Sequence, residues 1–235
     1  MSFLDQISVV IPVREGSSRI PEKIFLPFGN GMNLLEWKVS QIKQIHPWDK
    51  IFLSSNSERV KEIAQKMSIG YMPRADELCK GHTATFSEVI LGVVRELPTD
   101  YFAWVTAVVP LMRPTEYLEA FHMFEEHVVQ AGTHDSLAAV NLMKEYLWAN
   151  GQPLNYCADR NHTISQELPD IFRVTNGLYM RAKQDTLKEG YFLGPKPFLH
   201  KVEKISGIDI DELEDYNIAN QLKALYESRE NAGDH

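Results

Sequence analysis

Short runs of β-branched residues alternate with helix-like segments over the first 140 residues, and this alternation most constrains the fold. Buried strands are predicted at 7–12, 50–53, 101–109 and 135–142. Apolar spacing and N-cap residues predict helices at 34–45, 58–67, 83–97 and 114–130. Such an order favours an α/β fold in which helices flank a mostly parallel sheet. We expect residues 1–235 to form a single domain.

The region 144–173 breaks this pattern. Asn150-Gly151 is a strong signal for a two-residue hairpin turn, and polar, aperiodic residues follow it. The segment predicts an inserted arm, which is either an element that packs on a second subunit or a surface loop with its own hairpin. The main pattern then resumes, with strands predicted at 174–180 and 198–202 and a helix at 213–226.

The charge balance bears on the partners that the protein can bind. The chain carries 24 Lys and Arg against 32 Asp and Glu, a net charge of −8. An overall electrostatic grip on nucleic acid or anionic lipid is therefore not expected. An anionic ligand has to be met by a local basic patch.

The two cysteines, Cys79 and Cys157, form no C-x-x-C pair, so a structural zinc site is not expected. Lone thiols suit a reducing compartment. The N-terminus lacks the pattern of a signal peptide, and the longest apolar stretch, 102–112, is too short to span a bilayer. We therefore expect a cytoplasmic protein without a membrane partner.

The segment after the first strand is the first candidate for a binding site, because ligands of open α/β sheets bind beyond the carboxyl ends of the strands. Arg14 and Lys23 suit phosphate oxygens, and Gly16 allows backbone N–H groups to turn toward an anion. Neither a Walker loop nor a dinucleotide-binding fingerprint is present. A solvated polar loop is the alternative interpretation.

Asp209 and Asp211 form a second candidate near the C-terminus. They alternate with Ile208 and Ile210, so on a strand both carboxylates lie on one face and both isoleucines on the other. Paired carboxylates repel one another unless a cation lies between them, and together with substrate phosphates they suit Mg²⁺. The alternative is that these acids face water ahead of the last helix.

These segments resemble the signatures of a known family. The run IPVREGSSRIPEK at 11–23 is similar to the opening motif of the cytidylyltransferases that activate acidic sugars, the N-acylneuraminate and 3-deoxy-manno-octulosonate enzymes. GIDIDELED at 207–215 resembles their terminal motif, and TNGLY at 175–179 a strand between the two. The resemblance implies a Rossmann-like nucleotidyltransferase fold that uses CTP and Mg²⁺. It also implies a homodimer in which the 144–173 arm takes part.

The resemblance further implies roles for individual residues. It assigns catalysis to Arg14, Lys23 and Asp211, and Mg²⁺ binding to Asp209 and Asp211. The residues expected to bind the nucleotide are Pro12, Val13, Arg14, Gly16, Ser17, Lys23, Arg74, Thr83 and Thr85. Those expected to bind the acidic acceptor are Thr106, Arg173 and Asn176. For Arg74 a surface-loop role is the alternative, and Thr83 and Thr85 are also good helix N-caps.

The sequence departs from the family pattern mainly where the acceptor is expected. Ile24 stands where an Asn is usual, Ser165-Gln166 where Arg-Gln is common, and apolar residues replace polar ones over 105–112. Cytidylyl transfer is therefore better supported than any one sugar, and another anionic acceptor such as a phosphonate is an alternative. A sugar 1-phosphate nucleotidyltransferase and a non-catalytic protein on the same fold are further alternatives.

Overall fold

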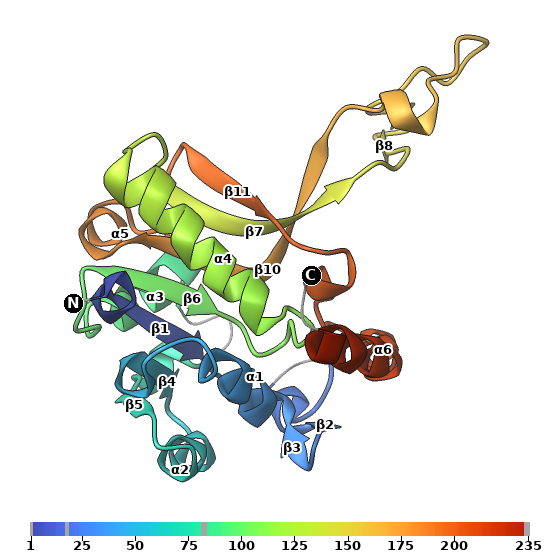
Figure 1. The fold of residues 1–235 in the computed structure, drawn as a ribbon. Helices are drawn as coiled ribbons and strands as arrows, with labels where there is room; N and C mark the ends of the chain where they lie inside the picture. The colour runs from blue at the N-terminus through green and yellow to red at the C-terminus, as the bar shows by residue number, and fades with distance from the viewer. Residues whose placement is uncertain (1, 17–18, 81–83, 233–235) are drawn as a thin grey trace.

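The computed structural model describes residues 2–16, 19–80 and 84–232, and within them seven strands form one central sheet (Figure 1). Its order is β11-β7-β10-β6-β1-β4-β5. β10 is antiparallel to both of its neighbours, whereas the pairings β1–β4, β1–β6, β4–β5 and β7–β11 are parallel. The prediction of a mostly parallel α/β sheet is confirmed. The strands are β1 (Ile7–Pro12), β4 (Ile51–Ser55), β5 (Gly70–Pro73), β6 (Tyr101–Val105), β7 (Ser136–Met143), β10 (Ile171–Ala182) and β11 (Pro197–Lys201).

Helices cover both faces of this sheet. They are α1 (Leu34–Ile42), α2 (Glu58–Lys66), α3 (Phe86–Val94), α4 (Pro114–Phe124), α5 (Lys183–Glu189) and α6 (Leu213–Ala232). Val9 and Ile11 of β1 pack in one core cluster with α1, α2 and α4, and Val10 packs with α3 in another. This alternation explains the unbroken apolar run of β1, because a central parallel strand is buried on both faces.

Capping residues fix where several helices begin. The hydroxyl of Ser57 accepts a hydrogen bond from the backbone N–H of Val60, and that of Thr85 accepts one from Glu88. A π-helical segment, Glu125–Gln130, continues α4, and together they cover the predicted helix at 114–130. Short 3₁₀ turns lie at Phe3–Gln6, Lys23–Phe25, Trp48–Lys50, Asp76–Leu78, Ser165–Glu167 and Ile205–Gly207.

Several predicted bounds are wrong. The strand predicted at 101–109 ends at Val105, and the helix predicted at 83–97 is confined to Phe86–Val94. The sequence did not predict β5, α5 or the small hairpin of β2 (Pro27–Gly29) and β3 (Met32–Asn33). The apolar residues after Val105 form a buried loop rather than a continuation of the strand. Those that are buried are Ala107, Val109, Leu111 and Met112.

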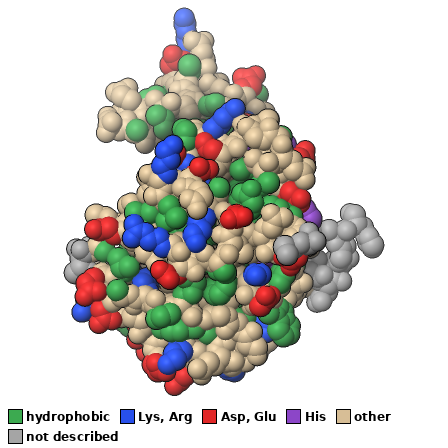
Figure 2. Space-filling view, turned by 90° about the vertical axis from the view of Figure 1, so that its left-hand side faces the viewer, with side chains coloured by type: hydrophobic (Ala, Val, Ile, Leu, Met, Phe, Trp, Pro, Cys, Tyr) green, Lys and Arg blue, Asp and Glu red, His purple; other side chains and the backbone are tan. Residues whose placement is uncertain are grey.

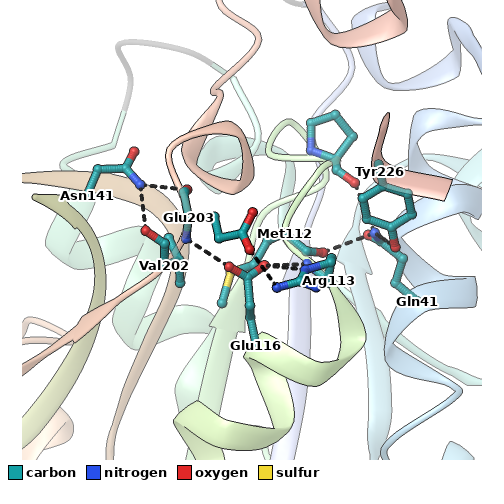
Figure 3. Close-up of polar contacts among 9 residues, drawn as sticks. Gln41, Met112, Arg113, Glu116, Asn141, Val202, Glu203 and Tyr226 are labelled. Carbon is teal, nitrogen blue, oxygen red and sulfur yellow. Dashed lines mark hydrogen bonds and ion pairs between the residues drawn. The ribbon is translucent and has the colours of Figure 1, made fainter. Parts of the chain in front are cut away.

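Hydrogen bonds hold this loop against its neighbours. Gln41 of α1 donates to the carbonyls of Pro110 and Met112 and to the hydroxyl of Tyr226 on α6 (Figure 3). At the start of α4, Glu116 accepts from the backbone N–H groups of Arg113 and Glu203. Because Glu203 follows β11, these contacts fix the chain that leads from β11 toward Asp209.

The arm projects from the body, and β7 and β10 lead into it (Figures 1 and 2). Its tip contains the antiparallel strands β8 (Trp148–Ala149) and β9 (Gln152–Pro153). Asn150 and Gly151 between them have φ angles of 51° and 75°, as a two-residue hairpin turn requires, so the predicted hairpin is confirmed. Within the described part of the chain, no helix has the length and apolar character needed to cross a membrane.

Candidate active site

A cleft of about 600 Å³ opens beyond the carboxyl ends of β1 and β6. A second hollow adjoins it and is formed largely by the segment that follows β1. The two share Pro12, Arg14, Thr106, Val108 and Asp211 in their walls. The structure thus brings the two sequence candidates, which come from opposite ends of the chain, into one site.

The segment after β1 is anchored at its start. Val13 donates its backbone N–H to the Ser54 carbonyl at 2.8 Å, and the buried guanidinium of Arg74 donates to the Val13 carbonyl at 2.7 Å. Arg74 also donates to the sulfur of Cys79 at 3.0 Å. Arg74 is therefore a buried support of the segment, and its side chain also reaches the wall of the cleft.

Arg14 and Gly16 lie beyond this anchor. Arg14 is exposed, lines both hollows and forms no hydrogen bond or ion pair with any described residue. Gly16 has a φ of 87°, a left-handed conformation that glycine adopts without the strain that a side chain brings.

Two other cations of the segment contact Asp211. The guanidinium of Arg19 lies 2.7 Å from its carboxylate, and the ammonium of Lys23 lies 3.6 Å from the same oxygen. Lys23 also donates to the carbonyl of Ile210. Arg19 lies within the 11–23 run, but nothing in the sequence indicates that it pairs with Asp211.

Asp209 and Asp211 both line the cleft, while Ile208 and Ile210 pack against a cluster that includes α6, as their alternation predicts. The segment is not a strand of the sheet, which corrects the prediction. A backbone hydrogen bond of 2.9 Å from Ile210 to the carbonyl of Val108 ties it to the loop after β6. Extended backbone is enough to place both carboxylates on one side.

Asp209 is the more buried of the two carboxylates. Its Oδ2 accepts from the side-chain amide of Asn176 at 2.9 Å, and its buried Oδ1 has no hydrogen-bond partner among the described residues. Burial raises the pKa of this carboxyl, and the negative charges of Asp211 and Asp215 act in the same direction. The amide hydrogen bond from Asn176 opposes them.

Asn176 lies in a bulge of β10, where the register shifts between Val174 and Tyr179. Its φ is 61°, a left-handed conformation that Asn tolerates better than most residues. Its backbone carbonyl accepts from the Thr106 hydroxyl at 2.8 Å, and its side-chain carbonyl accepts from the Tyr179 hydroxyl at 2.6 Å. Thr106 and Asn176, both predicted to bind the acceptor, therefore meet in the wall of the cleft.

Aromatic side chains form another part of the cleft, which we call the aromatic wall. Its members are Phe86, Trp104, Tyr179, Tyr191 and Phe192. Tyr179 stacks on Phe192 with ring centroids 4.0 Å apart, and Trp104 lies 5.6 Å from the same ring. Trp104 is buried, as a core residue should be, yet it also borders the cleft. No spacing pattern links these residues, so the sequence did not identify the wall.

Other predicted residues lie elsewhere. Thr85 caps α3 and does not line either hollow, although its neighbours Ala84 and Phe86 do. Arg173 is also outside both hollows, because it donates to the side-chain carbonyl of Asn141 and to the carbonyl of Gly207. Ser17 and Thr83 lie outside the described residues.

The donor set at this site fits Mg²⁺. Over residues 2–16, 19–80 and 84–232 there is no cluster of three or more His, Cys, Asp and Glu side chains suited to a metal. Two carboxylates are nevertheless sufficient for Mg²⁺, which takes its remaining ligands from water and substrate phosphates. The unpartnered Oδ1 of Asp209 is the kind of buried oxygen that such an ion satisfies.

Comparisons with known sequences point to the same class of enzyme as the family resemblance. A family model described as cytidylyltransferase matches residues 8–230. The chain is 23% identical over 227 residues to a pseudaminic acid cytidylyltransferase of Campylobacter jejuni. The aligned region covers 92% of this chain and 94% of that protein. It is 22% identical over 222 residues to an N-acylneuraminate cytidylyltransferase of Escherichia coli, covering 91% of this chain and 51% of that one. The chain thus spans about half the length of this second relative.

The fold also resembles solved structures. One is a CMP:2-keto-3-deoxy-manno-octonic acid synthetase complexed with CTP, with a TM-score of 0.65 and 14% identity. The match covers 94% of this chain and 99% of that one. At this identity the likeness concerns the fold, and it agrees with a Rossmann-like nucleotidyltransferase architecture.

Proposed function

This chain belongs to the cytidylyltransferase family, and we propose that it transfers CMP from CTP to an acidic 2-keto-3-deoxy sugar of the N-acylneuraminate type. The anomeric hydroxyl attacks the α-phosphorus of CTP, the bond to the bridging oxygen breaks, and pyrophosphate leaves. The hydroxyl proton passes to water, and a CMP-sugar forms. The protein's contribution to such a transfer is mainly positioning and charge neutralisation.

One observation carries the proposal. The cations that follow β1 contact the carboxylate of Asp211, which lines the same cleft as Asp209, and this cleft is large enough for a nucleotide and a sugar. Phosphates require the cations, and a divalent ion requires the carboxylates. A solvated surface loop explains neither the burial of Asp209 nor the tether between Lys23 and Ile210.

The nucleotide side of the proposal rests on Arg14, Lys23 and the backbone near Gly16. Arg14 is available to phosphate oxygens because no described residue pairs with it. Lys23 is nearly buried and already held, so it acts as a fixed charge next to the segment. Together these groups offset the charge that develops on departing pyrophosphate.

Asp209 and Asp211 are the residues proposed to hold Mg²⁺, through the free Oδ1 of Asp209 and the carboxylate of Asp211. When bound, the ion supplies positive charge near the phosphates and lowers the pKa of a coordinated hydroxyl. Arg19 and Lys23 hold the Asp211 carboxylate in place before any ligand enters.

The acceptor is proposed to bind along the aromatic wall. Phe86, Tyr191 and Phe192 offer apolar surface suited to the acylamino or deoxy carbons of an acidic sugar, while Arg74 and Lys80 lie in the wall of the same cleft. Val108 lines the cleft, within the 105–112 run where the family resemblance implies polar residues. This replacement favours an acceptor with fewer hydroxyl groups at that point.

We also propose that the arm joins two copies of the chain. Trp148, Leu154 and Ile164 lie on the arm and are more than half exposed, at 59%, 62% and 52%. Exposed apolar side chains on a projecting arm are typical of a contact surface for another protein. A second copy of this chain is the partner that the proposed function favours.

The test is pyrophosphate release from CTP in the presence of Mg²⁺ and a panel of acceptors. The panel contains an N-acylneuraminate, a diacylamino deoxy nonulosonate, 3-deoxy-manno-octulosonate, a phosphonate and a sugar 1-phosphate. Release with an acidic 2-keto-3-deoxy sugar and CTP, but not with ATP or UTP, is expected. Release with the sugar 1-phosphate alone, or absence of both turnover and calorimetric CTP binding, contradicts the proposal.

A further inference from the structure

Asn176 uses both its backbone and its side chain in contacts with other site residues. Its backbone carbonyl accepts from Thr106, its side-chain carbonyl accepts from Tyr179, and its side-chain N–H₂ donates to Oδ2 of Asp209. The three distances are 2.8, 2.6 and 2.9 Å. A contact residue for an incoming ligand usually keeps its amide free, and here the amide is largely engaged within the protein.

The chemistry of the partners determines which group donates and which accepts in each of these hydrogen bonds. An ionised carboxylate only accepts, so the N–H₂ group of Asn176 has to face Asp209. The amide oxygen then faces Tyr179, whose hydroxyl is the donor. Tyr179 itself is held by its stack on Phe192, so the whole series is anchored in the aromatic wall.

One oxygen of Asp209 is fixed by this arrangement and the other is presented to the site. Oδ2 takes the amide hydrogen bond, while Oδ1 is buried and has no hydrogen-bond partner in the part of the chain that is described. The left-handed backbone of Asn176 and the tether from Thr106 hold the bulge in the shape that this contact needs.

We infer that Thr106, Asn176 and Tyr179 form a positioning relay that orients the Asp209 carboxylate, leaving its Oδ1 to bind a divalent cation. Asn176 thus acts through Asp209, a different role from the acceptor contact that the sequence predicts. The inference rests on the metal role of Asp209 in the proposed function. Partners of metal ligands commonly govern metal affinity in this way.

The aromatic wall offers a matched control for Tyr179. Tyr191 lines the same cleft and also stacks on Phe192, with ring centroids 4.6 Å apart. Its hydroxyl has no hydrogen-bond partner among the residues described. Tyr179→Phe and Tyr191→Phe therefore each remove one hydroxyl from the same wall. Only Tyr179→Phe also removes a hydrogen bond to Asn176.

Asn176→Gly removes the amide while keeping the backbone. Glycine adopts a positive φ without steric cost, and its carbonyl can still accept from Thr106. Circular dichroism and thermal midpoints show whether each variant is folded before binding is compared.

The decisive measurement is a Mn²⁺ titration of the intact protein with CTP and no acceptor, followed by electron paramagnetic resonance. In Tyr179→Phe the half-saturating Mn²⁺ concentration is expected to rise about threefold, the loss of one ordinary hydrogen bond. Asn176→Gly is expected to raise it roughly tenfold. Tyr191→Phe should match the wild type.

Equal Mn²⁺ binding in all folded variants, or no Mn²⁺ binding by the wild type beyond that of CTP itself, overturns the relay. Because this titration needs no turnover, it is independent of acceptor identity. A wild type that binds Mn²⁺ through the relay but releases no pyrophosphate with any acceptor contradicts the proposed function alone.

Discussion

The side chains of Arg19 and Asp211 meet at 2.7 Å although 192 residues separate them in the chain. They are 54% and 48% exposed, so the ion pair contributes between about 0 and 1 kcal/mol to folding. Breaking a pair this weak costs little free energy. The contact therefore matters for the site more than for stability, because it brings the basic segment and the acidic motif together.

Asp211→Asn tests the acidic side of this contact. Loss of the charge removes a proposed metal ligand, so kcat/KM is expected to fall by at least the roughly 10- to 100-fold that loss of a ligand's hydrogen-bond partner produces. The thermal midpoint should stay within about 4 °C of the wild type, since the ion pair is exposed. Glu214→Gln is the matched control, because Glu214 is an exposed acid in the first turn of α6. Wild-type turnover in folded Asp211→Asn contradicts the assigned role.

Arg14→Ala tests the basic side. Charge-assisted hydrogen bonds to phosphate contribute about 1.5–3 kcal/mol, so kcat/KM for CTP is expected to fall about 10- to 150-fold. Stability should be unchanged, because Arg14 is exposed and pairs with no described residue. Arg95→Ala, an exposed arginine at the end of α3, controls for loss of a positive charge. Steady-state kinetics that match the wild type in Arg14→Ala refute the phosphate role.

Much of the fold could be predicted because the strands of a parallel sheet are buried on both faces. β1 has the bounds that its apolar run predicts, and the Asn150-Gly151 turn follows from local backbone preference. The same apolar signal led to the wrong prediction that the strand continues over 106–109. Apolar residues there report burial, but the Val108 carbonyl accepts from Ile210 rather than from a neighbouring strand. Just beyond, the carbonyls of Pro110 and Met112 accept from Gln41. α5 was missed because only Thr186 of its residues is buried.

The site was predictable where its residues are close in sequence. Lys23 and Asp211 belong to compact motifs, and the structure brings them together. The aromatic wall combines residues from α3, β6 and β10 with Tyr191 and Phe192, so only the tertiary fold assembles it. The relay through Asn176 likewise depends on a bulge in β10, which no local sequence pattern predicts. The contacts of Arg173 with Asn141 and Gly207 could not be predicted, because a motif gives the position of a residue but not its partners.

The arm gives a prediction about assembly. The intact protein is expected to sediment as a dimer at micromolar concentration, and Leu154→Glu should shift it toward the monomer, because a charge cannot be buried there without a partner. Ile218→Glu is the matched control, since Ile218 is a comparably exposed apolar residue on α6, at 51% against 62% for Leu154. A wild type that stays monomeric, or a dimer that tolerates Leu154→Glu, rules out this use of the arm.

His46 gives a prediction about acid stability. Its ring is buried against Phe121, its Nε2 donates to the Ile7 carbonyl at 3.0 Å, and its Nδ1 has no partner within the described ranges. Burial lowers the pKa of His46 from 6.5 to about 4, although the Ile7 carbonyl and the charges of Asp49 and Asp5 oppose this shift. The folded protein therefore holds His46 neutral where the unfolded chain already binds a proton.

The direction of the effect follows from this difference. Above pH 6.5 both states are neutral at His46, and as the pH falls toward 4 proton binding favours the unfolded chain. About 3 kcal/mol of stability is expected to be lost over that window. In His46→Gln, which keeps a donor for Ile7 but does not titrate, urea unfolding should show a smaller loss between pH 7 and pH 4. His122→Gln, at an exposed position on α4, should keep the full wild-type loss. Equal acid dependence in His46→Gln and the wild type means that carboxylates elsewhere govern acid unfolding.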